Sequence, residues 1–202
     1  MASLDQPPAA ISEPIGLPLP TRSGGRSLME ALGARRSSRE FSPQPLDLLL
    51  LSDLLWAACG INRRDDHRTA PSARNWQEID IYVALARGLF LFSPHHFHLE
   101  WILREDVRSL TGLQDFVELA PVNLIYVADL ARMQGMSDRN ELRFYSALDT
   151  GFIAQNVYLF CASAGLATVA RGLVDRRALA LKMGLRPEQR VILTQTVGYP
   201  AA

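Results

Sequence analysis

The stretch from Asp149 to Gly165 places the strongest constraint on how this chain folds. Asp149 or Thr150 is expected to cap the start of a helix, and Gly165 is expected to end it. Large apolar side chains nearly encircle the axis of this helix, a pattern typical of a helix buried inside a domain. The longest apolar run, residues 157–170, is shorter than the roughly 20 residues that a membrane-spanning helix needs. We therefore expect a domain folded around a central helix, and no membrane span. The encircling residues are Phe152, Ile153, Val157, Leu159 and Phe160.

Shorter patterns predict the other elements. Ser27 followed by Glu30 is a capping-box pattern, which predicts the start of a short helix. A second helix is expected from Leu46 to Ala58, ended by Gly60. The remaining helical patterns cover residues 105–118, interrupted at Gly112, and residues 176–183. Strand patterns cover residues 79–84, 89–92, 97–99, 121–128, 166–170 and 191–197.

The length and composition of the chain indicate one globular domain. With 202 residues it can bury a substantial core. We expect residues 1–25, rich in Pro, Ala, Ser and Gly, to form an extended arm and residues 26–202 to form a single domain. The formal net charge is +0, which excludes an overall field that would attract nucleic acid or an anionic membrane. The chain start lacks the regions of a signal peptide, and both cysteines lie in apolar stretches, so a cytoplasmic protein without disulfide bonds is expected.

A basic segment, Arg35-Arg36-Ser37-Ser38-Arg39, follows the first predicted helix. If it is extended, Arg35, Ser37 and Arg39 share one face, because successive side chains alternate. Two planar guanidinium groups with a hydroxyl between them suit a phosphate monoester, since arginine binds phosphate bidentately and stays charged. Taken alone, the same residues also fit a solvated basic turn after a helix.

The sequence His95-His96-Phe97-His98 has two interpretations. Imidazoles two residues apart on a strand share a face and can bind a metal ion. No carboxylate or cysteine stands at a suitable spacing, which favours a polar hairpin turn between two strands. We therefore predict no metal site.

Four motifs in a fixed order resemble the FMN-dependent nitroreductase family. The first is the basic segment, and the second is Thr-Ala-Pro-Ser-Ala-Arg-Asn-Trp-Gln at residues 69–77. The third is Leu-Asp-Thr-Gly-Phe-Ile-Ala-Gln-Asn at residues 148–156, and the fourth runs from Gly165 through Arg171-Gly172. The resemblance covers about residues 27–200. It is closest to the branch that includes the azoline-forming (SagB-like) dehydrogenases of peptide maturation.

The resemblance implies an α+β fold, in which a mostly antiparallel central sheet is flanked by helices. It also implies an intertwined homodimer with FMN at the subunit interface. No side chain is implied as a catalytic acid or base, because hydride passes from NAD(P)H through flavin N5 to a nitroaromatic, quinone or similar small-molecule acceptor. An FMN-binding carrier or sensor of the same fold, without turnover, is the alternative. The cofactor-binding residues implied are Arg35, Arg36, Ser37, Arg39, Pro71, Ser72, Asn75, Gln114, Arg171 and Gly172.

This chain departs from the family pattern at three places. Many relatives continue past the Gly-Tyr-Pro turn at residues 198–200 with basic residues, so here phosphate affinity is expected to rest on Arg35 and Arg39, with Arg186 or Arg190 as helpers. The Lys-Tyr pair of azoline-forming enzymes is missing from residues 139–145, which disfavours azoline oxidation. Arg171 stands where many relatives carry an acidic or small residue, so acceptor preference does not transfer.

Overall fold

The computed structural model describes residues 13–201 and contains one seven-stranded sheet. The strand order is β1-β4-β3-β2-β5-β7-β6, and every neighbouring pair is antiparallel. The sheet confirms the predicted mostly antiparallel α+β fold. Its strands are β1 (Ile15–Gly16), β2 (Ile79–Leu85), β3 (Gly88–Ser93), β4 (His98–Leu103), β5 (Val122–Asp129), β6 (Ala167–Arg171) and β7 (Gln189–Gly198).

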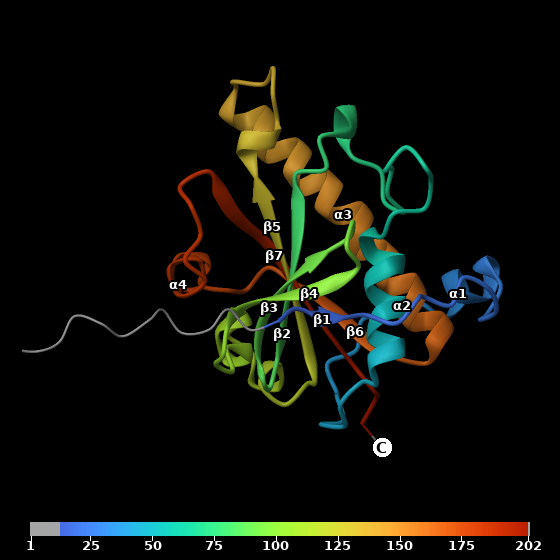
Figure 1. Cartoon of the computed structure of the whole chain (residues 1–202). Coiled ribbons are helices and arrows are strands. Elements are labelled where there is room, and N and C mark those ends of the chain that lie inside the picture. Colours follow the sequence, from blue (N-terminus) through green and yellow to red (C-terminus); the bar gives the residue numbers. More distant parts are fainter. Residues whose placement is uncertain (1–12, 202) are drawn as a thin grey trace, which may run out of the picture.

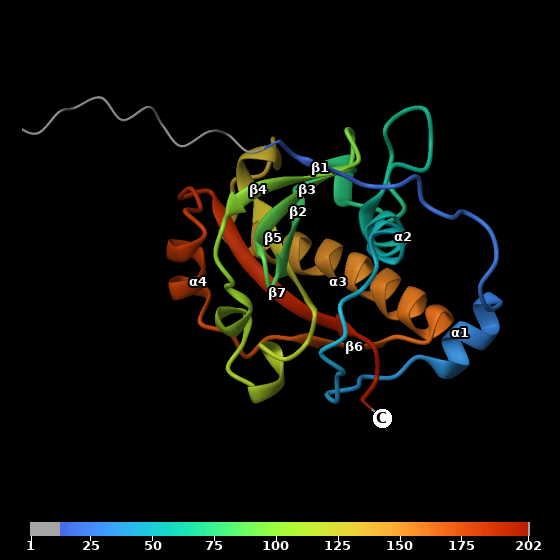
Figure 2. The same cartoon turned by 60° about the horizontal axis from the view of Figure 1, so that its bottom comes forward.

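Helices cover both faces of this sheet (Figure 1). The long helix α3 crosses one face, with α2 and α1 beside it, whereas α4 lies on the opposite side next to β7 (Figure 2). The α-helices are α1 (Leu28–Ala34), α2 (Leu48–Cys59), α3 (Arg139–Ala164) and α4 (Arg176–Lys182). Short 3-10 turns are η1 (Ala73–Asn75), η2 (Arg108–Thr111), η3 (Asp115–Val117) and η4 (Leu130–Arg132).

Each central strand contributes side chains to both faces of the sheet. On β5, Leu124 and Tyr126 pack into the cluster under α2 and α3, while Ile125 and Val127 pack into the cluster under α4. Side chains alternate along a strand, so a strand covered on both faces reads as a continuous apolar run. All eight residues of β5 are buried, which explains why its sequence is almost entirely apolar.

Helix α3 is longer than the sequence pattern predicts. It begins at Arg139, and the side chain of Asp138 caps it by accepting from the Asn140 amide. The prediction of a start at Asp149 or Thr150 was wrong, because the first turn of the helix, residues 139–143, is almost entirely polar and gave no sign of a buried helix. Gly165 ends the helix in the left-handed conformation, as expected. Burial is also less complete than predicted, since the Phe152 side chain stays 40% exposed.

The segment 105–118 is not the predicted helix. It forms the two short turns η2 and η3, with Gly112 extended between them. A Cβ atom at Gly112 would lie 1.8 Å from Nη1 of Arg171, so this backbone passes directly over a buried guanidinium group. That long-range contact, and not the local helical pattern, decides the conformation. The second predicted helix also begins two residues later than expected, after the Asp47 cap.

Within the described residues, the first part of the predicted arm lies along the edge of the sheet. Ile15 and Gly16 pair with Leu99 and His98 of β4, and the Leu17 amide donates to the Phe97 carbonyl. Residues 1–12 of the predicted arm lie outside the described residues. The histidine-rich stretch forms a hairpin turn between β3 and β4, where His98 contacts Glu100 at 2.9 Å. No helix among residues 13–201 is long and apolar enough to cross a membrane.

Candidate cofactor site

The basic segment leaves α1 and runs along the outer edge of the sheet. The capping box predicted from Ser27 and Glu30 is present and fixes the start of α1. After α1 ends, the Ser38 amide donates to the Thr168 carbonyl on β6 at 3.0 Å. Because β6 is the last strand of the sheet, its outer edge would otherwise present unpaired backbone groups. The segment is thus held against the sheet by a main-chain contact.

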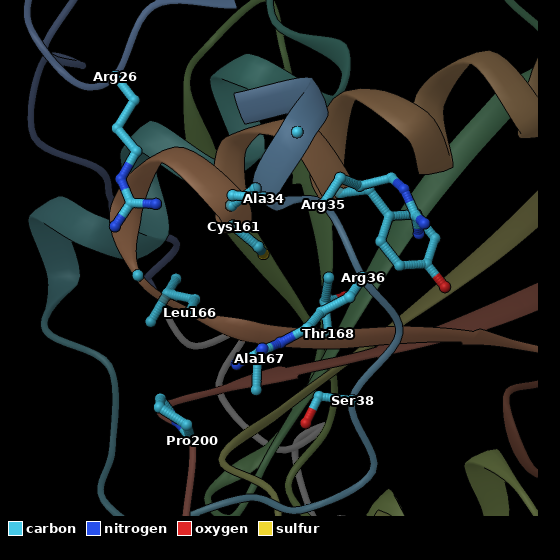
Figure 3. Close-up of a pocket in the computed structure, with 14 residues that line it drawn as sticks. Arg26, Ala34, Arg35, Arg36, Ser38, Cys161, Leu166, Ala167, Thr168 and Pro200 are labelled. Carbon is cyan, nitrogen blue, oxygen red and sulfur yellow. The ribbon is translucent and has the colours of Figure 1, made fainter. Parts of the chain in front are cut away.

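A cavity of about 390 Å³ opens between this segment, β6 and the end of α3. Arg26 and Arg35 approach it from different sides, and Arg36 and Ser38 lie near β6 (Figure 3). Cys161 belongs to its apolar part and is fully buried. The cavity therefore combines cationic groups at its wall with an apolar base.

The guanidinium groups at this cavity form no salt bridges with carboxylates of the described chain. Among residues 13–201, the salt bridges join other residues and include none of Arg26, Arg35 and Arg36. Several unpaired cations facing one cavity create a positive potential that attracts an anion. Arginine additionally supplies paired N–H donors that match phosphate oxygens.

Tyr158, in the second half of α3, joins the basic segment to β6. Its hydroxyl lies 2.9 Å from Oγ of Ser37 and accepts from the Ala170 amide at 2.8 Å. The guanidinium carbon of Arg35 lies 5.4 Å from the centre of the Tyr158 ring, a cation–π distance. Tyr158 therefore contacts both Arg35 and Ser37.

The loop that contains Pro71, Ser72 and Asn75 lies elsewhere, beside the first half of α3. Asp149 accepts from the Ala73 amide at 2.9 Å, and Ser72 accepts from the Gln77 amide at 3.0 Å. Arg74, Asn75 and Gln77 have positive φ angles of 51°, 52° and 49°. Such angles cost energy in residues other than glycine, so surrounding contacts must hold this loop in place.

Two buried carboxyl groups lie behind this loop. Glu78 is 0% exposed and Asp149 is 1% exposed, and the two carboxyl groups lie close enough to affect each other's pKa. Both side-chain oxygens of Glu78 and Oδ1 of Asp149 are buried without a hydrogen-bond partner among the described residues. Burial raises the pKa of Glu78 to about 7, and it also raises the pKa of Asp149 above its ordinary value. Two carboxylates this close cannot both ionise without mutual repulsion, so the pair retains a proton near neutral pH.

Arg171, at the end of β6, is a buried cation held by neutral oxygens. It is 4% exposed, and its guanidinium group donates to the Thr111 carbonyl at 2.9 Å and to Oδ1 of Asn123 at 2.9 Å. Gln114 lies at the limit of hydrogen bonding, 3.5 Å from Nη1. Burial lowers the pKa of Arg171 to about 10, so the group stays charged at neutral pH. Gly172 follows at the exposed surface.

Comparison with known proteins identifies the family. The model of the nitroreductase family matches residues 32–199. This chain belongs to the nitroreductase family. A candidate nitroreductase of Methanocaldococcus jannaschii is 34% identical over 155 residues, which are 72% of this chain and 78% of that protein.

Solved structures of the nitroreductase family match the same fold. The crystal structure of a candidate nitroreductase from Ralstonia eutropha JMP134 has a TM-score of 0.90 and 46% identity, covering 100% of this chain and 97% of that chain. The NADPH:FMN oxidoreductase of Vibrio harveyi, solved with NAD+, has a TM-score of 0.66 and 22% identity over 87% of this chain and 69% of its own. At that identity the second likeness shows the fold alone.

The residues that the sequence predicts for the cofactor divide into three groups in this nitroreductase-family chain. Arg35 and Arg36 line the cavity with Ser38, whereas Ser37 contacts Tyr158 and Arg39 is exposed. Arg35, Ser37 and Arg39 do not line the cavity together, because the segment is irregular and does not form a paired strand with alternating side chains. The second group, Gln114, Arg171 and Gly172, lies around the end of β6. The third, Pro71, Ser72 and Asn75, is not among the residues that line the cavity.

Sequence reasoning missed Arg26, Tyr158 and the carboxyl pair of Glu78 and Asp149 as site candidates. Tyr158 left a weak signal, because it is a hydroxyl-bearing residue within the apolar run of residues 157–161. Glu78 left a stronger one, since a carboxylate directly before a buried strand needs a partner. Arg26 gave no signal, because it belongs to the cavity only through the folding of α1 against α3.

Proposed function

We propose that this protein is an FMN-dependent oxidoreductase that uses NAD(P)H as hydride donor and works as a homodimer. The cavity with three guanidinium groups that form no salt bridge within residues 13–201 carries this proposal. Its acceptors would be nitroaromatics, quinones or similar small molecules. The description of the Vibrio harveyi protein as an NADPH:FMN oxidoreductase supports the same cofactor and donor. The azoline-forming branch and a cytoplasmic location stay predictions from the sequence.

The residues at the edge of β6 fit such a cofactor. Backbone groups of alternate residues point to the same edge of a strand, about 6.8 Å apart. On the outer edge of β6, Thr168 bonds Ser38 and Ala170 bonds Tyr158. The next residue in this series is Gly172. The same edge thus leads from the basic segment, suited to a phosphate group, towards a glycine amide, suited to a close approach by a planar ring.

In this proposal, the chain binds and orients while the cofactor supplies the redox chemistry. FMN, when bound, takes hydride from NAD(P)H and passes it to the acceptor. Arg35 and Arg36 would hold the phosphate, with Ser37 and Arg39 as further donors. Arg171 would add a buried positive charge behind Gly172, which favours electron-rich states of a nearby group. Gln114 would stay close to Arg171 and present its amide at the same end of β6.

The homodimer would bring the loop of Pro71, Ser72 and Asn75 to the site of the partner subunit. Exposed apolar side chains support such an interface. Phe144, Leu148 and Phe152 recur every four residues and so share one face of α3. A contiguous apolar face of this kind is typical of a surface that another protein covers.

Purification followed by flavin spectroscopy tests the proposal. We expect a yellow protein that absorbs at about 450 nm and is bleached by NAD(P)H under anaerobic conditions. A yellow protein that does not bleach with NADH or NADPH would instead support the carrier or sensor. A colourless protein that ignores added FMN would overturn both.

The variant Arg35→Ala tests the position of the phosphate. We expect FMN affinity to fall by about 10- to 100-fold, because a charged bidentate partner is lost. Arg177→Ala, an exposed arginine of α4, is the matched control and is expected to leave the affinity unchanged. Near-equal FMN binding by the two variants in fluorescence titrations would show that the phosphate lies elsewhere.

A further inference from the structure

The hydroxyl of Tyr158 stands in a chain of three hydrogen-bonding groups. On one side it accepts from the Ala170 amide at 2.8 Å, and on the other it meets Oγ of Ser37 at 2.9 Å. An amide N–H can only donate, so the Tyr158 oxygen must be the acceptor in the first contact. This fixes one end of the chain.

In the second contact either hydroxyl can be the donor, because the Tyr158 oxygen can accept a second hydrogen bond. The Tyr158 proton is free to donate, and Ser37 is the acceptor within reach. A phenol O–H is also a stronger donor than an aliphatic O–H. When Ser37 accepts from Tyr158, its own proton is left for another acceptor. In that arrangement, which the stronger phenol donor favours, the relay runs from Ala170 through Tyr158 to Ser37 and ends in a donor that a ligand can use.

The same tyrosine also restricts Arg35. Its ring lies 5.4 Å from the guanidinium carbon of Arg35, a cation–π contact that favours one orientation of this exposed side chain. Ser37 and Arg35 are alternate residues of one segment, whose backbone is tied to β6 through Ser38. A rigid support lowers the entropy that ligand binding must otherwise overcome.

We propose that Tyr158 is a positioning residue that aims the Ser37 hydroxyl and the Arg35 guanidinium group at one anionic group, and thereby makes the site select a phosphorylated flavin over the unphosphorylated one. This inference rests on the proposed function, since it takes the phosphate end of FMN as the ligand group. Riboflavin carries the same ring and ribityl chain but a terminal hydroxyl in place of the phosphate. Only the phosphate gains from an oriented donor beside a fixed cation.

The test compares FMN with riboflavin on the apo-protein. Both are titrated by flavin fluorescence against wild type, Tyr158→Phe, Ser37→Ala and Ser37→Thr. We expect Tyr158→Phe and Ser37→Ala to weaken FMN binding by about tenfold while riboflavin binding changes by less than about twofold. Ser37→Thr, which keeps the hydroxyl, should retain most of the preference. Tyr199→Phe, a tyrosine that packs against the main apolar cluster, is the matched control and should behave like wild type.

The outcomes separate this inference from the proposed function. Wild type that binds neither flavin refutes the proposed function, and the inference with it. Wild type that prefers FMN, together with variants that lose FMN and riboflavin affinity in equal proportion, leaves the proposed function standing and overturns the role of Tyr158. If Tyr158→Phe does not fold, the pair Ser37→Ala and Ser37→Thr decides, because equal FMN affinity in the two would show that the serine hydroxyl donates nothing to the ligand.

Discussion

Arg171 shows how one residue sets the local structure around it. Its guanidinium group lies under the extended backbone of Gly112 and contacts Thr111 and Asn123. Within residues 13–201 it forms no ion pair, so its charge is balanced only by the dipoles of neutral oxygens. Burial of such a charge is costly, and it is tolerated only when several hydrogen bonds compensate. The arginine thus organises the turn between η2 and η3.

Replacing Arg171 should therefore destabilise the fold. Arg171→Met fills much of the volume but removes one of the two donors to the Thr111 carbonyl and to the Asn123 oxygen, which keep only the hydroxyls of Thr194 and Thr196. The expected cost is about 1–3 kcal/mol in the free energy of unfolding. Urea denaturation followed by fluorescence measures this change. Arg177→Met on the exposed side of α4 should stay within about 0.5 kcal/mol of wild type. A loss of similar size in both variants would mean that the buried contacts of Arg171 contribute little.

At the scale of elements, the two halves of α3 make different contacts. Its first ten residues are mostly polar, and there Tyr145 packs edge-on against Trp76 with 5.9 Å between ring centres. Its second half is buried against the sheet and places Tyr158 beside β6. Asp149 stands between the halves and binds the Ala73 amide. The helix therefore connects the loop of residues 71–77 to the candidate cofactor site.

The buried pair of Glu78 and Asp149 should make stability depend on pH. The pKa of Glu78 rises from an ordinary 4.5 to about 7 in the folded chain. Between these values the folded state binds more protons than the unfolded state, so the free energy of unfolding falls as pH rises through this range. The contribution of the pair is complete below about pH 4.5 and lost above about pH 7.

Glu78→Gln should remove this pH dependence, because the amide keeps a donor to Asp149 at every pH. Relative to wild type, the variant is expected to gain on the order of 1–3 kcal/mol between pH 5 and pH 8. Urea unfolding at intervals of one pH unit measures the difference. Glu188→Gln, at an exposed turn, is the control and should keep the wild-type slope. Parallel curves for wild type and Glu78→Gln would show that the pair does not hold a proton in this range.

At the scale of the whole molecule, the exposed apolar faces of α1 and α3 are unusual for a chain that works alone. Leu28 and Met29 of α1 are exposed, as are Phe144, Leu148 and Phe152 of α3. The two helices contact each other, and both contribute residues to the candidate cavity or lead directly into the segment that lines it. A second copy of the chain is the partner that the proposed function assigns to them.

The oligomeric state gives a direct measurement. We expect wild type to have twice the 22.4 kDa mass of one chain in light scattering coupled to size exclusion. The double variant Leu148→Glu with Phe152→Glu should give a monomer with reduced FMN content, because charges are costly to bury in an interface. Leu181→Glu on α4, a more exposed apolar residue on the opposite face of the sheet, should remain dimeric. A monomeric wild type that binds FMN fully would refute the dimer.

The sequence by itself determined those parts of this protein that depend on local patterns. Continuous apolar runs predicted the buried strands, capping residues predicted α1, and Gly165 predicted the end of α3, because each of these signals acts between near neighbours. The order of four motifs predicted the nitroreductase family, which the family model and the relatives confirm.

Only the tertiary structure decided the features that join distant residues. Gly112 is extended because Arg171, 59 positions later, lies beneath it, and a local helical pattern contains no trace of that contact. Arg26 reaches the cavity, Tyr158 reaches Ser37, and Glu78 meets Asp149 only after the helices have packed on the sheet. Such contacts follow from the free energy of burying whole surfaces, and a stretch of sequence does not record which distant surface will cover it.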